Sequence, residues 1–256
     1  MDLLGHEYRL AQELTPYKTL SRSKWIPEIG GIVTRQGRRE AFLVCYYPGD
    51  DLRSHFAVEN STKRRWVIQV ATALAELNSM NFFHQDVKCA NIVLDEFDDI
   101  RIIDLENGGG TDGWTHPDNL TAFIAAHEES DLMVSSFVCG DAQHSTLPPI
   151  PQSEPAASPP VPEWAPITAS PISEAGMSTF GFPPPFRSRS VGEKRRFQVY
   201  GFGKTVWELY VGKKPINDDD LLRTPPWVQR LVRGCCKEDA FASMDEVISF
   251  LDSHLE

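Results

Sequence analysis

The amino-acid sequence predicts an α+β fold, with one helix and a strand pair first and a mainly helical part after them. Two observations support this prediction. Two pairs of short segments rich in β-branched and apolar residues lie before Asp104, and several longer segments carry apolar residues at helical spacing. With 256 residues, the chain is long enough to bury a sizeable core in one large domain or in two lobes.

A helix and a strand pair are expected within the first 50 residues. Apolar residues recur at helical spacing over residues 6–14. Residues 29–33 and 41–46 are rich in β-branched, aromatic and apolar side chains, and the turn-forming sequence Arg35-Gln36-Gly37 separates them. This pattern is typical of two paired strands.

The middle of the chain is expected to combine a long helix with a short hairpin. Apolar residues at helical spacing mark the buried face of a helix over residues 63–80. A polar loop follows, and after it residues 92–94 and 100–103 form two short strands joined by an acidic turn. This hairpin ends at Asp104.

The last part of the chain is expected to be helical. Order should resume at Phe197, with one helix that stops near Gly212 and a second helix around residues 227–232. Ser243 and Glu246 have the spacing of a capping box at the start of the last helix.

A proline-rich segment separates these helices from the rest of the chain. Residues 147–186 carry twelve of the nineteen prolines, interleaved with Ser and Ala. Such a composition buries too little apolar surface to offset the entropy of ordering, so we expect residues 119–196 to be a largely disordered insertion. Pro183-Pro184-Pro185 suits a proline-motif-binding partner, but a tolerated insertion without a partner is the simpler interpretation.

Charge and cysteine content argue against several classes of protein. The formal net charge is −11, which argues against binding to nucleic acid or to an anionic membrane surface. The five cysteines are odd in number and lack the spacing of metal ligands, and no apolar run is long enough to span a bilayer. The first residues do not resemble a signal peptide, so we expect an intracellular protein, cytoplasmic or nuclear.

The residues with the clearest chemistry lie in the polar loop between the long helix and the short hairpin. The loop reads His84-Gln85-Asp86-Val87-Lys88-Cys89-Ala90-Asn91, and Asp104 follows the hairpin. Phosphoryl transfer needs a carboxylate that orients a hydroxyl nucleophile, a cation for the transferred phosphate and oxygen ligands for Mg²⁺. The chain has these residue types in that order: Asp86, Lys88, Asn91 and Asp104.

This loop resembles that of the eukaryotic protein kinases, whose pattern is H-R-D-x-K-x-x-N followed by D-F-G. The resemblance implies a protein kinase-like fold with a partial N-lobe and a mainly helical C-lobe. It implies ATP-dependent phosphoryl transfer to Ser or Thr of a protein substrate, since Lys88 is the choice of serine/threonine kinases. Asp86 would be the catalytic base and Lys88 the contact to the γ-phosphate, while Asn91 and Asp104 would bind Mg²⁺.

Other segments extend the resemblance. Residues 199–215 are similar to a helix of the kinase C-lobe and the G-x-x-P sequence after it. Residues 42–49 look like the last N-lobe strand and the hinge, where the adenine of ATP would be held by Cys45, Tyr46 and Tyr47. Glu7 looks like the glutamate that kinases pair with a lysine.

The sequence departs from the kinase pattern at several positions. It begins at the helix that carries Glu7, so we expect a truncated N-lobe without the glycine-rich loop and the V-A-I-K lysine. Loss of one preorganised electrostatic partner commonly lowers a rate by about 10²–10³-fold. The other departures are Gln85 for arginine, Leu105 and Glu106 for phenylalanine and glycine, Gln198 for the aspartate that braces the catalytic loop, and Pro48 in the hinge.

The resemblance implies four regions. They are a partial N-lobe and hinge over 1–50, the first part of the C-lobe with the catalytic loop over 51–118, the insertion over 119–196, and the C-lobe helices over 197–256. The end of the activation segment stays open between two places: residues 113–118 fit by residue type, and residues 181–186 fit by spacing. We favour the first.

Two other functions stay open. The chain could be a non-catalytic pseudokinase whose C-lobe serves as a binding surface. It could also be a small-molecule phosphotransferase of the aminoglycoside or choline kinase type, since Asp104-Leu105-Glu106 fits the D-x-E pattern of those enzymes. Lys88 and residues 199–215 favour a protein kinase. Turnover of an amino alcohol or aminoglycoside, with none of a peptide, would reverse that preference.

Overall fold

The computed structural model describes residues 3–84, 86–105, 189–212, 216–238 and 240–254. All of them belong to one compact unit, Met1–Ile124 with Pro183–Glu256, and the second unit, Ala125–Phe182, lies outside the described residues. The expectations for Gln85, Glu106, both candidate ends of the activation segment and the proline-rich segment also fall outside them. The described residues form an α+β fold, as predicted.

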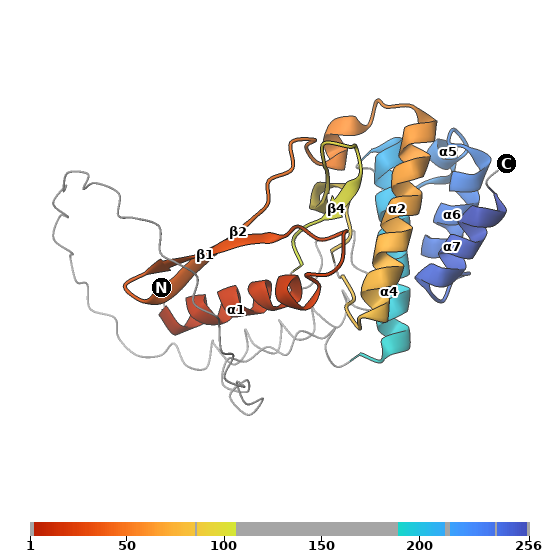
Figure 1. Cartoon of the computed structure of the whole chain (residues 1–256). Coiled ribbons are helices and arrows are strands. Elements are labelled where there is room, and N and C mark those ends of the chain that lie inside the picture. The colour runs from red at the N-terminus through yellow and green to blue at the C-terminus, as the bar shows by residue number, and fades with distance from the viewer. Residues whose placement is uncertain (1–2, 85, 106–188, 213–215, 239, 255–256) are drawn as a thin grey trace, which may run out of the picture. The chain divides into compact units, whose positions relative to one another are not determined.

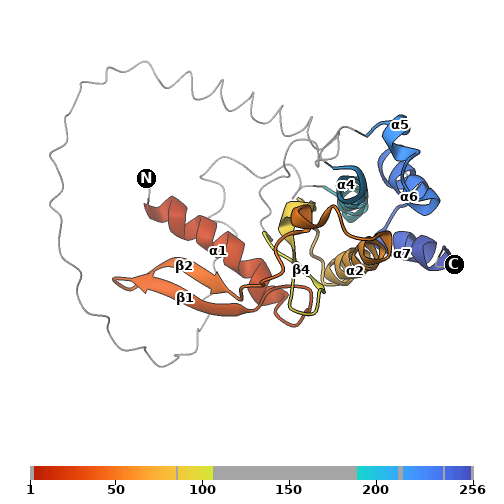
Figure 2. The same cartoon turned by 90° about the horizontal axis from the view of Figure 1, so that it is seen from above.

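The first helix and the first hairpin form the N-terminal part of the fold. Helix α1 (Leu3–Thr19) extends further in both directions than its apolar spacing predicts. Strands β1 (Ile29–Arg35) and β2 (Arg38–Val44) form the predicted antiparallel pair. The helix lies alongside this hairpin in both views (Figures 1 and 2), and the ring centroids of Tyr17 and Phe42 are 5.3 Å apart.

A second small sheet connects this part to the helices. Strands β3 (Ile92–Leu94) and β4 (Ile100–Ile102) pair antiparallel, as predicted, and the first and last residue of each strand are buried. The segment after β2 runs along β3, because the Gly49 N–H donates to Leu94 O at 3.1 Å and the Leu94 N–H donates to Asp50 O at 3.0 Å. On the other side, the Ile102 N–H donates to Trp25 O at 2.7 Å.

Helices and short 3₁₀ turns make up the rest of the described fold. Helix α2 (Asn60–Ser79) packs against α7 (Met244–Ser253) and α4 (Val191–Val211), and α4 packs against α6 (Pro226–Cys236), as Figures 1 and 2 show. The shorter elements are the 3₁₀ turns η1 (Leu52–His55) and η2 (Cys89–Asn91) and the helix α5 (Asp218–Leu221). Large apolar side chains of α2 and α4 form the core between them, including Trp66, Leu74, Phe202 and Trp207. No helix in the described ranges is long and apolar enough to cross a membrane.

The start of α4 corrects the predicted boundary at Phe197. The helix begins at Val191, because the Ser190 hydroxyl accepts a hydrogen bond from the Glu193 N–H while the Glu193 carboxylate binds the Ser190 N–H. This complete capping box starts a helix whose first turns are too polar for apolar periodicity to detect. Residues 191–196, assigned to the insertion by sequence, are therefore helical.

The predicted capping box at the last helix forms only in part. The Ser243 hydroxyl accepts a hydrogen bond from the Glu246 N–H at 3.4 Å, as expected. The Glu246 carboxylate, however, accepts from the Ala242 N–H at 2.8 Å instead of from the N-cap residue itself. The helix still starts at Met244, since a side-chain cap is present.

Candidate active site

The loop after α2 is organised around a buried histidine. His84 is 1% exposed, its Nδ1 accepts a hydrogen bond from the Asp86 N–H at 3.1 Å, and its Nε2 lies 3.1 Å from Ile103 O. An Nδ1 that accepts leaves the proton on Nε2, which then donates to Ile103 O. Burial lowers the pKa of His84, so this neutral form is the one that the loop holds. His84 thereby links the loop to the segment that ends in Asp104.

Three of the predicted catalytic residues come together in this loop. Lys88 Nζ donates to Asp86 Oδ2, and Asn91 Nδ2 donates to Asp86 O at 2.9 Å and to Asp86 Oδ2 at 3.2 Å. The side chains of Lys88 and Asp86 are 20% and 16% exposed, so both can be reached from solvent. An ammonium group and an amide therefore lie within hydrogen-bonding distance of one carboxylate at a partly exposed position.

Asp104 lies at the exposed end of the segment after β4. The preceding residue fixes it beside the loop, since the Ile103 N–H donates to Asn91 O at 2.9 Å and Ile103 O accepts from His84. Asp104 itself has φ +59°, in the left-handed region, and its N–H donates to the Tyr17 hydroxyl at 3.2 Å. Burial raises the pKa of Tyr17, while hydrogen bonding by the Asp104 backbone acts in the opposite direction.

Asn91 and Asp104 carry side-chain oxygens of the kind that bind Mg²⁺ in the presence of a nucleotide. The Asn91 amide nitrogen is turned towards Asp86, which leaves its amide oxygen as the atom available to a cation. Mg²⁺ is usually bound by one or two protein oxygens together with water and substrate phosphates. Within the described residues, no three His, Cys, Asp or Glu side chains gather as a candidate metal site.

Helix α4 supports the loop through two buried polar side chains that bond the loop backbone. Thr205 Oγ1 donates a hydrogen bond of 2.7 Å to Val87 O, and Glu208 Oε2 accepts one of 3.0 Å from the Cys89 N–H. Gln198, expected at the bracing position, is buried, and its Oε1 lies 2.6 Å from the side-chain amide of Asn78 in α2, which donates to it when that amide is turned by 180°. Sequence reasoning missed Thr205 and Glu208, although polar residues on an apolar helix face are a usable signal.

The thiol of Cys89 is a structural group. Its Sγ lies 3.6 Å from Thr205 O, and the side chain is fully buried. Burial raises the pKa of the Cys89 thiol well above its usual value, and the nearby Glu208 raises it further. The thiol therefore stays protonated and is not a nucleophile.

The predicted hinge residues lie on the segment between β2 and η1. The Cys45 N–H donates to Glu28 O at 2.9 Å, and the Tyr46 side chain is 85% exposed. The Tyr47 ring lies 5.5 Å from the Arg101 guanidinium, which pairs with Asp95 at 2.6 Å. Glu7 lies in α1, but its side chain is outside the described part, so its expected pairing is untested.

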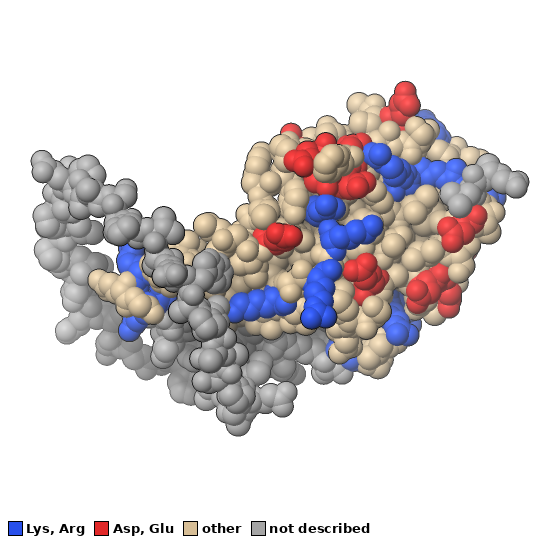
Figure 3. All heavy atoms as spheres, in the orientation of Figure 1, with Lys and Arg blue, Asp and Glu red and all other residues tan. Residues whose placement is uncertain are grey.

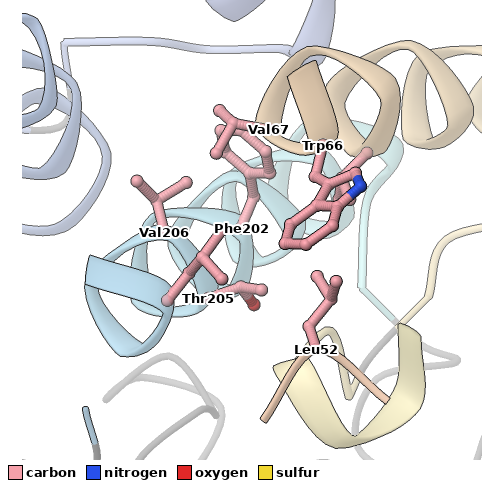
Figure 4. Close-up of a pocket in the computed structure, with 8 residues that line it drawn as sticks. Leu52, Trp66, Val67, Phe202, Thr205 and Val206 are labelled. Atoms are coloured by element: carbon pink, nitrogen blue, oxygen red, sulfur yellow. The ribbon is translucent and has the colours of Figure 1, made fainter. Parts of the chain in front are cut away.

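Two other features of the structure do not form sites. A cavity lined by Leu52, Trp66, Phe202 and Thr205 (Figure 4) has a volume of about 10 Å³, that of roughly one water-sized sphere. Acidic side chains gather near the β3–β4 turn (Figure 3), but there Arg101 pairs with Asp95 and Arg65 with Asp98. The turn is therefore a paired surface.

The helix, the loop after it and the aspartate after the second hairpin have the residue types and the order associated with phosphoryl transfer. In agreement with this, residues 6–106 match the family model described as protein tyrosine and serine/threonine kinase. The matched range includes most of α1, both hairpins, the loop after α2 and Asp104. Over this range the chain is similar to the protein kinase family. A comparison with curated proteins found no match.

Proposed function

We propose that this kinase-like domain binds ATP with Mg²⁺ and transfers the γ-phosphoryl group to Ser or Thr of a protein substrate. The observation that carries the proposal is the assembly of Asp86, Lys88 and Asn91 in one hydrogen-bonded group. Phosphoryl transfer depends mostly on positioning and electrostatic stabilisation, and this group supplies both.

Each residue has a distinct part in this proposal. Asp86 orients the substrate hydroxyl and accepts its proton, and Lys88 holds one oxygen of that carboxylate while its charge faces the transferred phosphate. Asn91 and Asp104 are the residues that would hold Mg²⁺, which when bound neutralises phosphate charge. Cys45, Tyr46 and Tyr47 would contact adenine, and Glu7 would position the phosphates through a basic partner.

One observation favours the pseudokinase alternative. The Cys45 N–H already donates to Glu28 O, so this hinge amide is not offered to an adenine ring. A chain with an intact catalytic loop but weak nucleotide contacts would act as a binding surface, and the proline-rich segment would then recruit a proline-motif-binding partner.

The first test is a thermal shift of the 256-residue chain with ATP, with and without Mg²⁺. The proposal expects a rise in Tm that needs Mg²⁺ and is lost in Asp104→Asn. The matched control is Asp252→Asn, which removes an exposed carboxylate of α7 and should keep the shift. A cooperative melt that ignores nucleotide would favour the pseudokinase.

The second test is phosphoryl transfer itself. The wild type and Asp86→Asn are incubated with radiolabelled ATP and a Ser/Thr peptide library, and with amino alcohols and aminoglycosides in parallel. Transfer to peptides that is lost in Asp86→Asn supports the proposal. Transfer only to the small amines would replace it with the small-molecule phosphotransferase, and transfer to neither would leave the binding function alone.

A further inference from the structure

The inference concerns Tyr17, a residue that the kinase pattern does not single out. Tyr17 lies in the last turns of α1, is 6% exposed and packs its ring against Phe42 of β2 at a centroid distance of 5.3 Å. Its hydroxyl oxygen accepts the hydrogen bond from the Asp104 N–H at 3.2 Å. A single side chain thus connects the helix, the first hairpin and the backbone of the candidate metal ligand.

The backbone at Asp104 needs such support. Its φ of +59° lies in the left-handed region, which residues with a side chain adopt infrequently. A backbone of this kind persists where its surroundings hold it, and here two neighbours do so. Ile103 is bonded to Asn91 and His84 on one side, and Leu105 is buried in the core on the other. Between them, the Asp104 N–H is bonded only through Tyr17 in the described part of the chain.

We propose that Tyr17 is a positioning residue whose hydroxyl fixes the Asp104 turn and so couples the placement of α1 to Mg²⁺ binding. The proposal rests on the function proposed above, in which Asp104 holds the metal. It deepens that function, because α1 then acts on the candidate metal ligand through the hydroxyl of Tyr17, which bonds the Asp104 backbone. Any displacement of α1 from β4 breaks the bond and releases the turn at Asp104.

The test uses Tyr17→Phe, which keeps the ring on Phe42 and removes only the hydroxyl. Amide hydrogen exchange at Asp104 and Leu105 is measured without nucleotide, and the Kd for ATP is measured with Mg²⁺ and with EDTA. Since one hydrogen bond contributes a modest net free energy, exchange at Asp104 and the Kd with Mg²⁺ should each rise by about 3–10-fold. The Kd in EDTA should not change.

The matched control is Tyr210→Phe. The Tyr210 hydroxyl, unlike that of Tyr17, donates to a backbone carbonyl, Asn60 O at 3.4 Å, and it lies on α4 near the start of α2. This variant should leave the exchange at Asp104 and both Kd values as in the wild type. In Asp104→Asn, adding Tyr17→Phe should cause no further loss of Mg²⁺-dependent affinity, because the residue that Tyr17 positions no longer binds metal.

The outcomes separate this inference from the proposed function. Unchanged exchange at Asp104 in Tyr17→Phe would overturn the inference. Faster exchange with an unchanged Kd in Mg²⁺ would overturn the coupling to metal. If the wild type shows no Mg²⁺-dependent affinity, the proposed function and the metal half of the inference both fall, and faster exchange in Tyr17→Phe still supports the hold on the turn.

Discussion

At the scale of single residues, the candidate site depends on buried polar side chains that each make one or two hydrogen bonds. Thr205, Glu208, His84 and Tyr17 all bond backbone atoms of the two segments that carry the acidic residues. An unpaired buried polar group costs more free energy than a satisfied one contributes, so these positions should be sensitive to small changes.

Thr205→Val should lower the free energy of unfolding by about 1–3 kcal/mol, because Val87 O would lose its buried donor while the shape is kept. The measurement is urea denaturation. Thr205 also bonds Gly201 O within its own helix, so the control is Thr72→Val, because the Thr72 hydroxyl makes the same kind of bond to Ile68 O one turn back in α2. If both variants lower the free energy of unfolding by the same amount, the hydrogen bond from Thr205 to Val87 O does not stabilise the loop.

His84 predicts a pH dependence with a definite sign. Burial lowers the pKa of His84 in the folded protein, so the unfolded chain binds this proton more tightly. The contribution of neutral His84 to stability is therefore complete above about pH 6.5. That contribution is lost as the pH falls below 6.5 towards the lowered folded pKa. Urea denaturation at pH 7.5, 6.5 and 5.5 should therefore show a steeper loss for the wild type than for His84→Gln.

The glutamine can accept from the Asp86 N–H and donate to Ile103 O, but it does not titrate. Parallel slopes for the wild type and His84→Gln would show that His84 is not the titrating group.

At the scale of elements, close helix packing and the first hairpin turn set the geometry. A Cβ at Gly203 of α4 would lie 2.4 Å from Cys235 Cβ and 2.6 Å from Cys236 Sγ of α6, closer than side chains approach. Gly203→Ala should therefore destabilise the fold by about 1–3 kcal/mol through overpacking. Gly192→Ala is the matched control in the same helix, since nothing lies within 4 Å of its Cβ.

Calorimetric melting of both alanine variants checks this prediction. Gly192→Ala should be neutral or stabilising by up to about 1 kcal/mol, because alanine is the better helix former. An equal Tm for the two variants would mean that α4 and α6 can move apart to accommodate the added methyl group without loss of stability.

The β1–β2 turn predicts a stabilising change. Gln36 and Gly37 have φ of +52° and +77°, the pattern of a two-residue hairpin turn that favours Asn-Gly. Gln36→Asn should raise the free energy of unfolding by a few tenths of a kcal/mol, because asparagine adopts the left-handed conformation at a lower cost than glutamine. Gly37→Ala should do the reverse, although nothing lies within 4 Å of its Cβ, and urea denaturation measures both.

At the scale of the whole molecule, local patterns predicted most elements and missed the contacts between them. Enrichment in β-branched and apolar residues located both hairpins, and helical spacing located α2, whose buried residues follow that spacing. The loop motif located Asp86, Lys88 and Asn91, since their spacing is itself the signal. The start of α4 was missed because a polar capping box, not apolar spacing, defines it.

The supports of the candidate site were beyond prediction for a different reason. Tyr17 and Thr205 lie far along the chain from the backbone groups that they bond, and nothing local distinguishes a tyrosine with a partner from one that merely packs. Only the packing of α1 on β2 and of α4 under the loop brings each hydroxyl to its partner.

The pairing of Gly49 and Asp50 with Leu94 has a consequence for how the chain folds. This pairing closes a long stretch of chain that contains α2 and the whole catalytic loop. Contacts between residues distant in sequence form only after the entropy of closing the intervening chain has been overcome. The pairing that encloses the loop over residues 84–91 is therefore expected to form late in folding. A nascent chain would form helix α2 well before this loop reaches its folded conformation.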